Sequence, residues 1–318
     1  MNRITRRNSS LFLSFSVLLL ISNFLPGCRS HELYRDRRVM MGTFVEVVSP
    51  EKRAPAIVFD EIKKIENLLS KYKKGSDIFE LNQRGQWRVS LQTLYLLDKA
   101  RFFWEKSAGA FDITIGPLMD VWGFTDKNYR VPGKEEIEKV LSCVGFEKII
   151  FNLHDTVVKF KLSGMKLDAG AIAKGYAVDC AVQALKDAGI KNCLINAGGQ
   201  IYCLGDKFGE PWHVAVRDPR HQSFVAEMAL KNKAVSTSGD YEQYFTNNNL
   251  RYAHIMDPKT GYPADSKVIS VTVIADDGLT ADALSTAIFV LGRQKGEALA
   301  KEFPGVTIKV IEAQDGFQ

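Results

Sequence analysis

The chain has few cysteines, and none of them is arranged as a metal site or a redox pair. Five occur in 318 residues, with no CxxC pair and no Cys/His cluster at zinc spacing. Cys193 and Cys203 flank a glycine-rich turn and could form a disulfide in an oxidising compartment. Buried free thiols are the alternative. The sequence thus argues against a zinc ribbon and leaves the state of these two cysteines open.

The motifs of several common enzyme classes are also missing. No GxGxxG follows the first predicted strand, and the GxxxxGK[ST] spacing of a Walker A loop is absent. There is no GxSxG nucleophile elbow, no Ser-His-Asp order and no Cys-His pair that stands out. We find no repeat of fixed period, no low-complexity tract and no block of like charge. These absences argue against a Rossmann domain and a P-loop.

The chain carries little net charge once its N-terminus is set apart. The formal net charge is +5, and Arg3, Arg6 and Arg7 account for three of these charges in a segment, residues 1–27, that holds no acid. The nearly neutral remainder gives no electrostatic case for nucleic-acid binding. At 46% hydrophobic and 25% charged residues, the composition is that of a globular protein.

The N-terminus has the pattern of a secretory signal. The three arginines precede an apolar run at residues 11–21, shorter than the roughly 20 residues that a membrane-spanning helix needs. Leu25-Pro26-Gly27-Cys28 then resembles a bacterial lipobox, although Pro26 is unusual there. We expect residues 1–27 to be a signal peptide, Cys28 to be lipidated and residues 28–38 to be a tether. The protein would face the periplasm, anchored to a membrane. The alternative is an uncleaved anchor.

Hydrophobic periodicity predicts an α+β fold. Strands occur in antiparallel-looking groups with helices inserted, without a regular βαβ rhythm and without a convincing linker. We therefore expect residues 39–318 to form one compact domain of antiparallel-rich sheets. The predicted helices are 56–69, 91–107, 134–144, 171–188 and 280–291. The predicted strands are 39–48 (interrupted at 41–43), 151–162 (with a turn at 154–155), 193–195, 212–216, 224–230, 268–274 and 306–311.

Two glycine-containing segments are candidates for ligand binding. Residues 109–117 read GAFDITIGP and precede Trp122-Gly123-Phe124, so backbone and aromatic faces could approach a ring. The structural alternative is a tight turn with a core Phe111 and a capping Asp112. Residues 168–176 read DAGAIAKGY and enter a helix, whose free N–H groups and Lys174 suit a phosphate. The alternative there is an Asp N-cap and a surface lysine.

Polar residues with chemical potential lie in the second half of the chain. Asp282 and Thr286 are four residues apart on a predicted helix, so they share a face and offer hard oxygens suited to Mg²⁺. The alternative is that Asp282 stabilises the first helical turn and Thr286 bonds to a carbonyl. Residues 236–241 read as a hydroxyl-rich turn, and His254 precedes another turn, Asp257 to Gly261.

These residues could together serve a transferase acting on a phosphoanhydride. Such an enzyme needs no covalent intermediate. It needs a metal to neutralise charge, a cation near the leaving phosphate and a base for the incoming hydroxyl. Asp282, Thr286, Lys174 and His254 could supply those parts.

The motifs, taken in order, resemble the ApbE family of FAD:protein FMN transferases. The resemblance runs from about Met41 to about Gly292. Its motifs are Met41-Gly42-Thr43, Ser70-Lys71-Tyr72 with Leu81-Asn82, GAFDITIGPL at 109–118, WGF at 122–124, LDAGAIAKGYAVD at 167–179, NAGG at 196–199, TSGDY at 237–241, HIMDPKTGYP at 254–263 and ADALSTA at 281–287. It implies one T-fold-related domain, FAD as substrate, Mg²⁺ as cofactor, and a partner flavoprotein that receives FMN on a Thr or Ser while AMP is released.

The resemblance also implies residue roles. The FAD site would comprise Met41, Tyr72, Ala110, Phe111, Asp112, Asp168, Lys174 and Met256. The metal would be held by Asp282, Thr286 and the backbone oxygen of Ala171, with Ser285 close by, and His254 falls at the family's active-site histidine. Family members often have Ser or Thr in place of Lys71, and an acid in place of Gln200. FAD hydrolysis to FMN and AMP, and flavin binding without catalysis, remain alternatives.

Overall fold

The computed structural model describes residues 32–152 and 154–313, and the chain from Glu32 onward forms one compact unit. The predicted signal peptide, residues 1–27, and the predicted lipidation site Cys28 lie outside the described residues. Within the described part of the chain, no helix is both long and apolar enough to cross a membrane.

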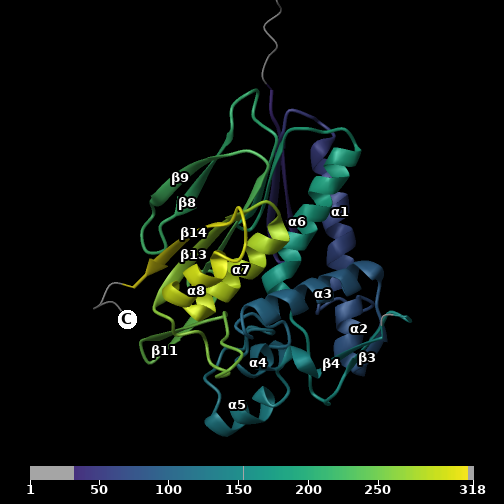
Figure 1. The fold of residues 1–318 in the computed structure, drawn as a ribbon, viewed down its shortest axis with the longest axis vertical. Coiled ribbons are helices and arrows are strands. Elements are labelled where there is room, and N and C mark those ends of the chain that lie inside the picture. Colours follow the sequence, from purple (N-terminus) through teal and green to yellow (C-terminus); the bar gives the residue numbers. More distant parts are fainter. Residues whose placement is uncertain (1–31, 153, 314–318) are drawn as a thin grey trace, which may run out of the picture. The chain divides into compact units, whose positions relative to one another are not determined.

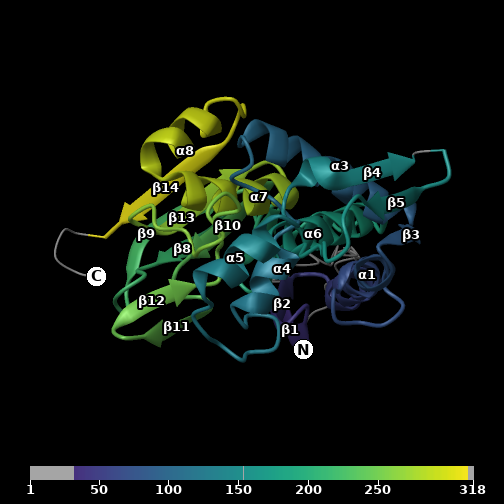
Figure 2. The same ribbon diagram turned by 90° about the horizontal axis from the view of Figure 1, so that it is seen from below.

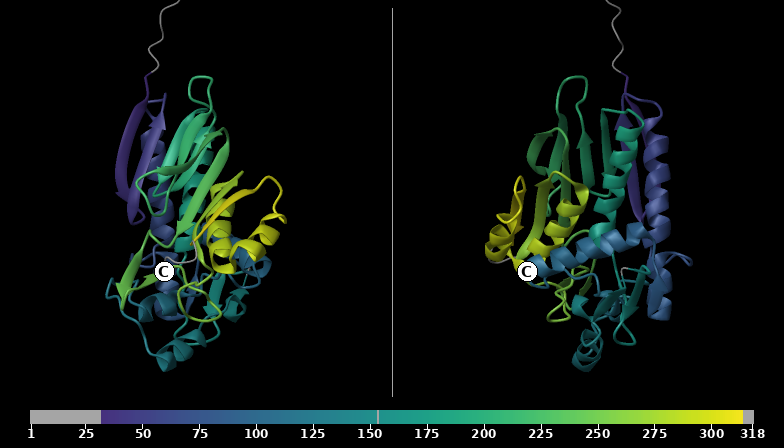
Figure 3. Two further views of the ribbon diagram at one scale, coloured as in Figure 1. Left: turned by 90° about the vertical axis from the view of Figure 1, so that its left-hand side faces the viewer. Right: turned by 45° about the vertical axis from the view of Figure 1, so that its right-hand side comes forward.

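A seven-stranded antiparallel sheet runs through the middle of the unit. Its strand order is β1-β2-β6-β7-β10-β13-β14, and each neighbouring pair is antiparallel. Figure 3 shows the purple edge formed by β1 and β2 and the opposite, yellow edge formed by β14. The strands are β1 Tyr34–Met40, β2 Thr43–Ser49, β6 Cys193–Ala197, β7 Gln200–Leu204, β10 Lys233–Gly239, β13 Val268–Ala275 and β14 Thr307–Glu312.

Three helices cover one face of this sheet, with α6 between the other two (Figure 1). They are α1 Ala54–Leu69, α6 Gly170–Asp187 and α7 Gly278–Leu291, and α8 Arg293–Ala300 follows α7. Their apolar faces and that face of the sheet form the main core. Helices α6 and α7 meet at very short range, because a Cβ on Gly175 would collide with the backbone of Gly278. This contact fixes where the two helices place their polar side chains.

A two-stranded hairpin packs on the opposite face of the sheet. It consists of β8 Trp212–Arg217 and β9 Phe224–Leu230, and Trp212 and Val214 contact Val48 and Cys203 there. Cys193 pairs with Leu204 and Cys203 with Leu194, so the two cysteine side chains point to opposite faces. Both are buried free thiols, which removes the disulfide alternative.

The remaining elements surround one end of these layers. Helices α4 and α5 and the hairpin β11–β12 lie at the lower end in Figure 1 and face the viewer in Figure 2. A small sheet of order β3-β5-β4 lies nearby. The bounds of the remaining elements are α2 Asp77–Arg84, β3 Gln86–Arg88, α3 Leu91–Lys106, α4 Gly116–Val121, α5 Lys134–Leu141, the 3₁₀ turn η1 Phe146–Lys148, β4 Ile149–Asn152, β5 Val157–Phe160, β11 Tyr244–Asn247 and β12 Leu250–Ala253.

The α+β prediction is confirmed, and the structure corrects three local predictions. Strand β1 already begins at Tyr34, so the later half of the proposed tether 28–38 belongs to the fold. The interrupted strand at 39–48 is a hairpin of two strands that turns at Met41 and Gly42, both with positive φ. The segment 236–241 was predicted as a turn, but its first four residues belong to β10, a strand with neighbours on both sides.

Candidate active site

A cavity of about 940 Å³ collects nearly all the predicted site residues. Its wall is built from the end of α1, the loop before α4, the start of α6, strand β10, the segment before and after His254, and one face of α7. Ser285 is absent from the lining. The predicted residues that line the cavity are Met41, Tyr72, Ala110, Phe111, Asp112, Asp168, Ala171, Lys174, His254, Met256, Asp282 and Thr286.

Asp282 carries the one carboxylate of the predicted metal site, and only 3% of the residue is exposed. Its Oδ2 accepts a hydrogen bond from the backbone N–H of Gly175 at 2.9 Å. Its Oδ1 lies 3.6 Å from Lys174 Nζ and 3.4 Å from Ser236 Oγ. The first turn of α7 is capped instead by Asp277, which accepts from the N–H of Thr280. Asp282 therefore does not serve as a helix cap; it faces α6 and the cavity.

Thr286 lies one turn further along α7, on the face that lines the cavity. Its Oγ1 is 3.3 Å from the hydroxyl of Ser238 on β10. The neighbouring Ser285 is fully buried, donates to the backbone oxygen of Asp282 at 2.9 Å and lies 2.8 Å from Ser238. Ser285 thus lies behind the cavity wall, in contact with Ser238, whereas Thr286 lines the cavity.

The predicted metal ligands offer a donor set that fits Mg²⁺. Asp282 and Thr286 bring a carboxylate and a hydroxyl to a cavity that Ala171 also lines, and Mg²⁺ uses few protein oxygens with water and substrate phosphates. Between residues 32 and 313, Leu153 aside, no three His, Cys, Asp or Glu side chains gather as a metal cage. The fit therefore rests on one carboxylate, one hydroxyl and one backbone carbonyl.

Lys174 places a positive charge at the start of α6. Its Nζ donates to the carbonyl oxygen of Gly170 at 3.0 Å and lies beside Asp282. Burial alone would lower the pKa of Lys174, but nearby carboxylates, Asp282 first, raise it above its ordinary value. The N-cap residue Ala169 has no side-chain hydrogen bond to the helix. The cavity therefore has a lysine cation beside a helix N-terminus, an arrangement suited to phosphate.

His254 lies in the same cavity as an uncharged imidazole. Its Nδ1 is 3.1 Å from the carbonyl oxygen of Gln243, which can only accept, so Nδ1 carries the proton and Nε2 the lone pair. Burial is the main cause that lowers the pKa of His254, to about 4. A neutral imidazole with a free Nε2 can take a proton near pH 7.

The aromatic and glycine-rich segment also lines the cavity. Tyr72 is 64% exposed at the mouth, whereas Phe111 is 1% exposed. Asp112 accepts from the N–H of Thr114 at 2.7 Å and of Phe146 at 3.1 Å, so the turn-capping role weighed for it from the sequence is present. Burial is the main cause that raises the pKa of Asp112 to about 6.

Lys71, Glu66 and Glu242 are ionisable residues of the lining that the sequence analysis did not name as site residues. Lys71 Nζ lies 2.7 Å from Asp168 Oδ2. Glu66 accepts from the N–H of Met41 at 2.8 Å, which holds that residue at its positive φ of 50°. Glu242 lines the cavity as well, and burial is the main cause that raises its pKa to about 7. Only the closeness of these residues to the motifs in the sequence could have indicated them.

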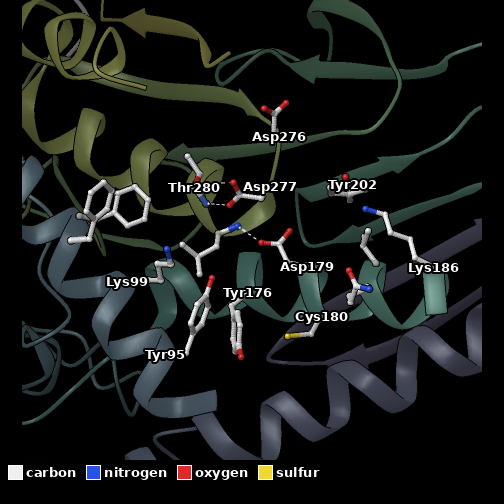
Figure 4. A pocket seen from close by; sticks show the side chains of 15 residues that line it. Tyr95, Lys99, Tyr176, Asp179, Cys180, Lys186, Tyr202, Asp276, Asp277 and Thr280 are labelled. Carbon is white, nitrogen blue, oxygen red and sulfur yellow. Dashed lines mark hydrogen bonds between the residues drawn. The ribbon is translucent and has the colours of Figure 1, made fainter. Parts of the chain in front are cut away.

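A second cavity, of about 490 Å³, lies against the middle and the C-terminal end of α6, and none of the predicted site residues lines it. Asp179 accepts from the N–H groups of Gly278 and Leu279, at 2.6 and 2.8 Å. Figure 4 shows the side chain of Asp179 in this cavity. The rings of Tyr95 and Tyr176 lie nearby, with their centroids 5.7 Å apart. Asp179 therefore ties α6 to the first turn of α7, the helix that carries Asp282.

Comparison with known proteins identifies the family of the chain. A protein-family model described as the ApbE family matches residues 41–310. The chain belongs to the ApbE family. Its relatives include the FAD:protein FMN transferase of Treponema pallidum, 33% identical over 94% of this chain and 91% of the relative. That of Vibrio cholerae is 32% identical over 81% of this chain and 79% of the relative.

The ApbE fold is also present in solved structures that resemble this one. The ApbE protein of Thermotoga maritima has a TM-score of 0.82 and 38% identity, covering 88% of this chain and 94% of that one. The flavin transferase ApbE of Vibrio cholerae has a TM-score of 0.80 and 30% identity, covering 89% and 94%. The fold predicted for the whole domain is therefore the ApbE fold.

Proposed function

We propose that this ApbE-family protein transfers FMN from FAD to a Thr or Ser hydroxyl of another flavoprotein and releases AMP. The observation that carries the proposal is the single cavity in which Asp282, Thr286, Lys174 and His254 meet. These four side chains supply hard oxygens, a cation and a neutral base, the parts that transfer from a phosphoanhydride requires. Relatives named FAD:protein FMN transferase support the choice of FAD and of a protein acceptor.

The proposed step is one displacement at the phosphorus of the FMN half. The acceptor oxygen bonds to this phosphorus while the bond from phosphorus to the bridging oxygen breaks, and AMP leaves with that oxygen. His254 takes the hydroxyl proton at Nε2, which its link to Gln243 leaves free. Lys174 offsets negative charge on the phosphates.

The same proposal includes Mg²⁺ and an export route. Mg²⁺ held by Asp282, Thr286 and the carbonyl oxygen of Ala171 would supply positive charge against the phosphates of FAD. The signal pattern and the lipobox support a periplasmic lipoprotein anchored through Cys28. Mass spectrometry of the mature N-terminus would test this: a diacylated Cys28 is expected, and an intact residue 1 would contradict it.

The deciding experiment supplies purified protein with FAD, Mg²⁺ and a candidate acceptor flavoprotein domain. Mass spectrometry should find the acceptor heavier by one FMN, and chromatography should find AMP in equal amount. An acceptor whose target Thr or Ser is replaced by Ala is the control and should stay unlabelled. AMP formed equally well without any acceptor would indicate an FAD pyrophosphatase. FAD that stays bound and intact for hours would indicate a flavin-binding lipoprotein.

A further inference from the structure

Lys71 forms a largely buried ion pair inside the cavity, at a position where members of the family often have Ser or Thr. The residue follows the end of α1, and 12% of its side chain is exposed. Its Nζ lies 2.7 Å from Asp168 Oδ2, 3.0 Å from Thr125 Oγ1 and 5.0 Å from the centre of the Tyr72 ring. All four of these residues line the cavity. The lysine is therefore fixed from three sides and does not swing free in solvent.

Among the residues that the structure describes, Lys71 is the one cation in hydrogen-bonding contact with Asp168. Asp168 Oδ1 accepts from the backbone N–H of Gly170 at 2.9 Å, and its Oδ2 is taken by Lys71. Only 14% of the Asp168 side chain is exposed. Burial alone would raise the pKa of Asp168, but Lys71 keeps it below its ordinary value. Without Lys71, a poorly solvated carboxylate would lose its counter-charge.

Because of the charges that line the cavity, losing the counter-charge of Asp168 should lower the affinity for FAD. Acidic side chains outnumber the lysines of the lining, which are Lys71, Lys127 and Lys174. FAD has a negative charge on each phosphate of its pyrophosphate, whereas riboflavin has no phosphate. An unpaired carboxylate at Asp168 would repel the first ligand and leave the second nearly unaffected.

We propose that Lys71 is a positioning residue that neutralises Asp168 and thereby lets this cavity hold the anionic part of FAD. The inference rests on the proposed function for the choice of ligand. Lys71 acts through Asp168 and takes no part in the bonds that form or break. A Ser or Thr at this position could not supply the same charge.

The test compares the affinity of wild-type protein and of Lys71→Met for FAD and for riboflavin, by flavin fluorescence without added metal. Lys71→Met should weaken FAD binding at least about tenfold, equivalent to about 1.4 kcal/mol. Its riboflavin affinity should change less than threefold. Lys74→Met is the matched control, because Lys74 is exposed in the same loop and outside the cavity lining, and should bind FAD as wild type does. Lys71→Arg should retain FAD affinity.

A second variant separates neutralisation from a simple loss of fold. Asp168 itself belongs to the expected FAD site, so Lys71→Met/Asp168→Asn is compared with Asp168→Asn alone. In that background the charge to be neutralised is gone, and Lys71→Met should weaken FAD binding less than threefold. Equal loss of FAD and riboflavin affinity in Lys71→Met, unchanged FAD affinity, or a Lys71→Met effect as large in the Asp168→Asn background as in the wild-type background would each overturn the inference. A wild-type protein that binds FAD but transfers no FMN would overturn the proposed function instead, and the binding comparison would still decide the role of Lys71.

Discussion

The carboxylate of Asp282 on α7 accepts a hydrogen bond from the backbone N–H of Gly175 on α6, with the two atoms 2.9 Å apart. The bond joins the helix that carries the predicted metal ligands to the helix whose start carries Lys174. It uses only Oδ2, so Oδ1 remains directed towards Lys174 and Ser236. The position of one carboxylate oxygen therefore depends on how closely two helices pack.

Replacing Asp282 should remove activity without removing the fold. Asp282→Asn keeps an oxygen for the N–H of Gly175 but loses the negative charge, the only carboxylate charge among the proposed metal ligands. We expect Mg²⁺-dependent turnover to fall by more than about 100-fold in Asp282→Asn, and to be abolished in Asp282→Ala. Turnover is followed as AMP release against Mg²⁺ concentration, with the melting temperature as a control for folding. Full Mg²⁺-dependent activity in either variant would show that the metal lies elsewhere.

Replacing His254 should slow transfer more than it weakens FAD binding. A general base typically contributes 10²- to 10⁴-fold to the rate, so we expect His254→Ala to lower the single-turnover rate by about that factor. FAD affinity, measured separately, should change only slightly. If FAD affinity falls while bound FAD still reacts at the wild-type rate, His254 is a binding residue.

The lowered pKa of His254 also predicts how stability depends on pH. The unfolded chain binds a proton at this histidine near its ordinary pKa of about 6.5, whereas the folded protein does so only at about pH 4. His254 thus favours unfolding progressively as the pH falls from about 6.5 to about 4. We expect the melting temperature of His254→Asn to fall less than that of the wild type between pH 7 and pH 4.5. Parallel loss in both proteins would contradict the prediction.

The close approach of α6 and α7 predicts a costly glycine substitution. A methyl group at Gly175 would collide with the backbone of Gly278, so the helices must separate. We expect Gly175→Ala to cost about 1–3 kcal/mol of unfolding free energy, as overpacked cores do, and to lower activity through Asp282. Thermal or denaturant unfolding measures the first effect. Gly133→Ala is the control, because its nearest contact would lie at 3.7 Å; equal stability of the two variants would refute the packing argument.

Local sequence patterns predicted the long elements well and the polar centre of the sheet poorly. Helices α3 and α6 are long and end close before Gly109 and Gly189, so their predicted bounds came within two residues of the structure. Strand β10 was missed because Ser, Thr and Gly are typical of turns. Ser236 and Ser238 are nevertheless buried, because neighbouring strands and α7 enclose them. Tertiary packing decided this segment, and composition could not show that.

The ion pair of Lys71 and Asp168 illustrates a second limit. The two residues stand 97 positions apart, and each belongs to a motif whose interpretation did not need the other. The residues implied by the family resemblance came together because their order along the chain reflects one fold. No motif in the sequence links Lys71 to Asp168, because this pair differs from the family pattern. Only the three-dimensional structure shows that the two residues are in contact.

The placement of Cys193 and Cys203 on opposite faces of the sheet has a practical consequence. Each thiol is fully buried, and burial raises the pKa of both to about 12, so neither forms a reactive thiolate in the native protein. The folded domain should form alike in a reducing cytosol and in an oxidising periplasm. A thiol-labelling reagent should reach these two sulfur atoms only when the sheet opens. The rate at which they are modified should therefore report the rate of unfolding.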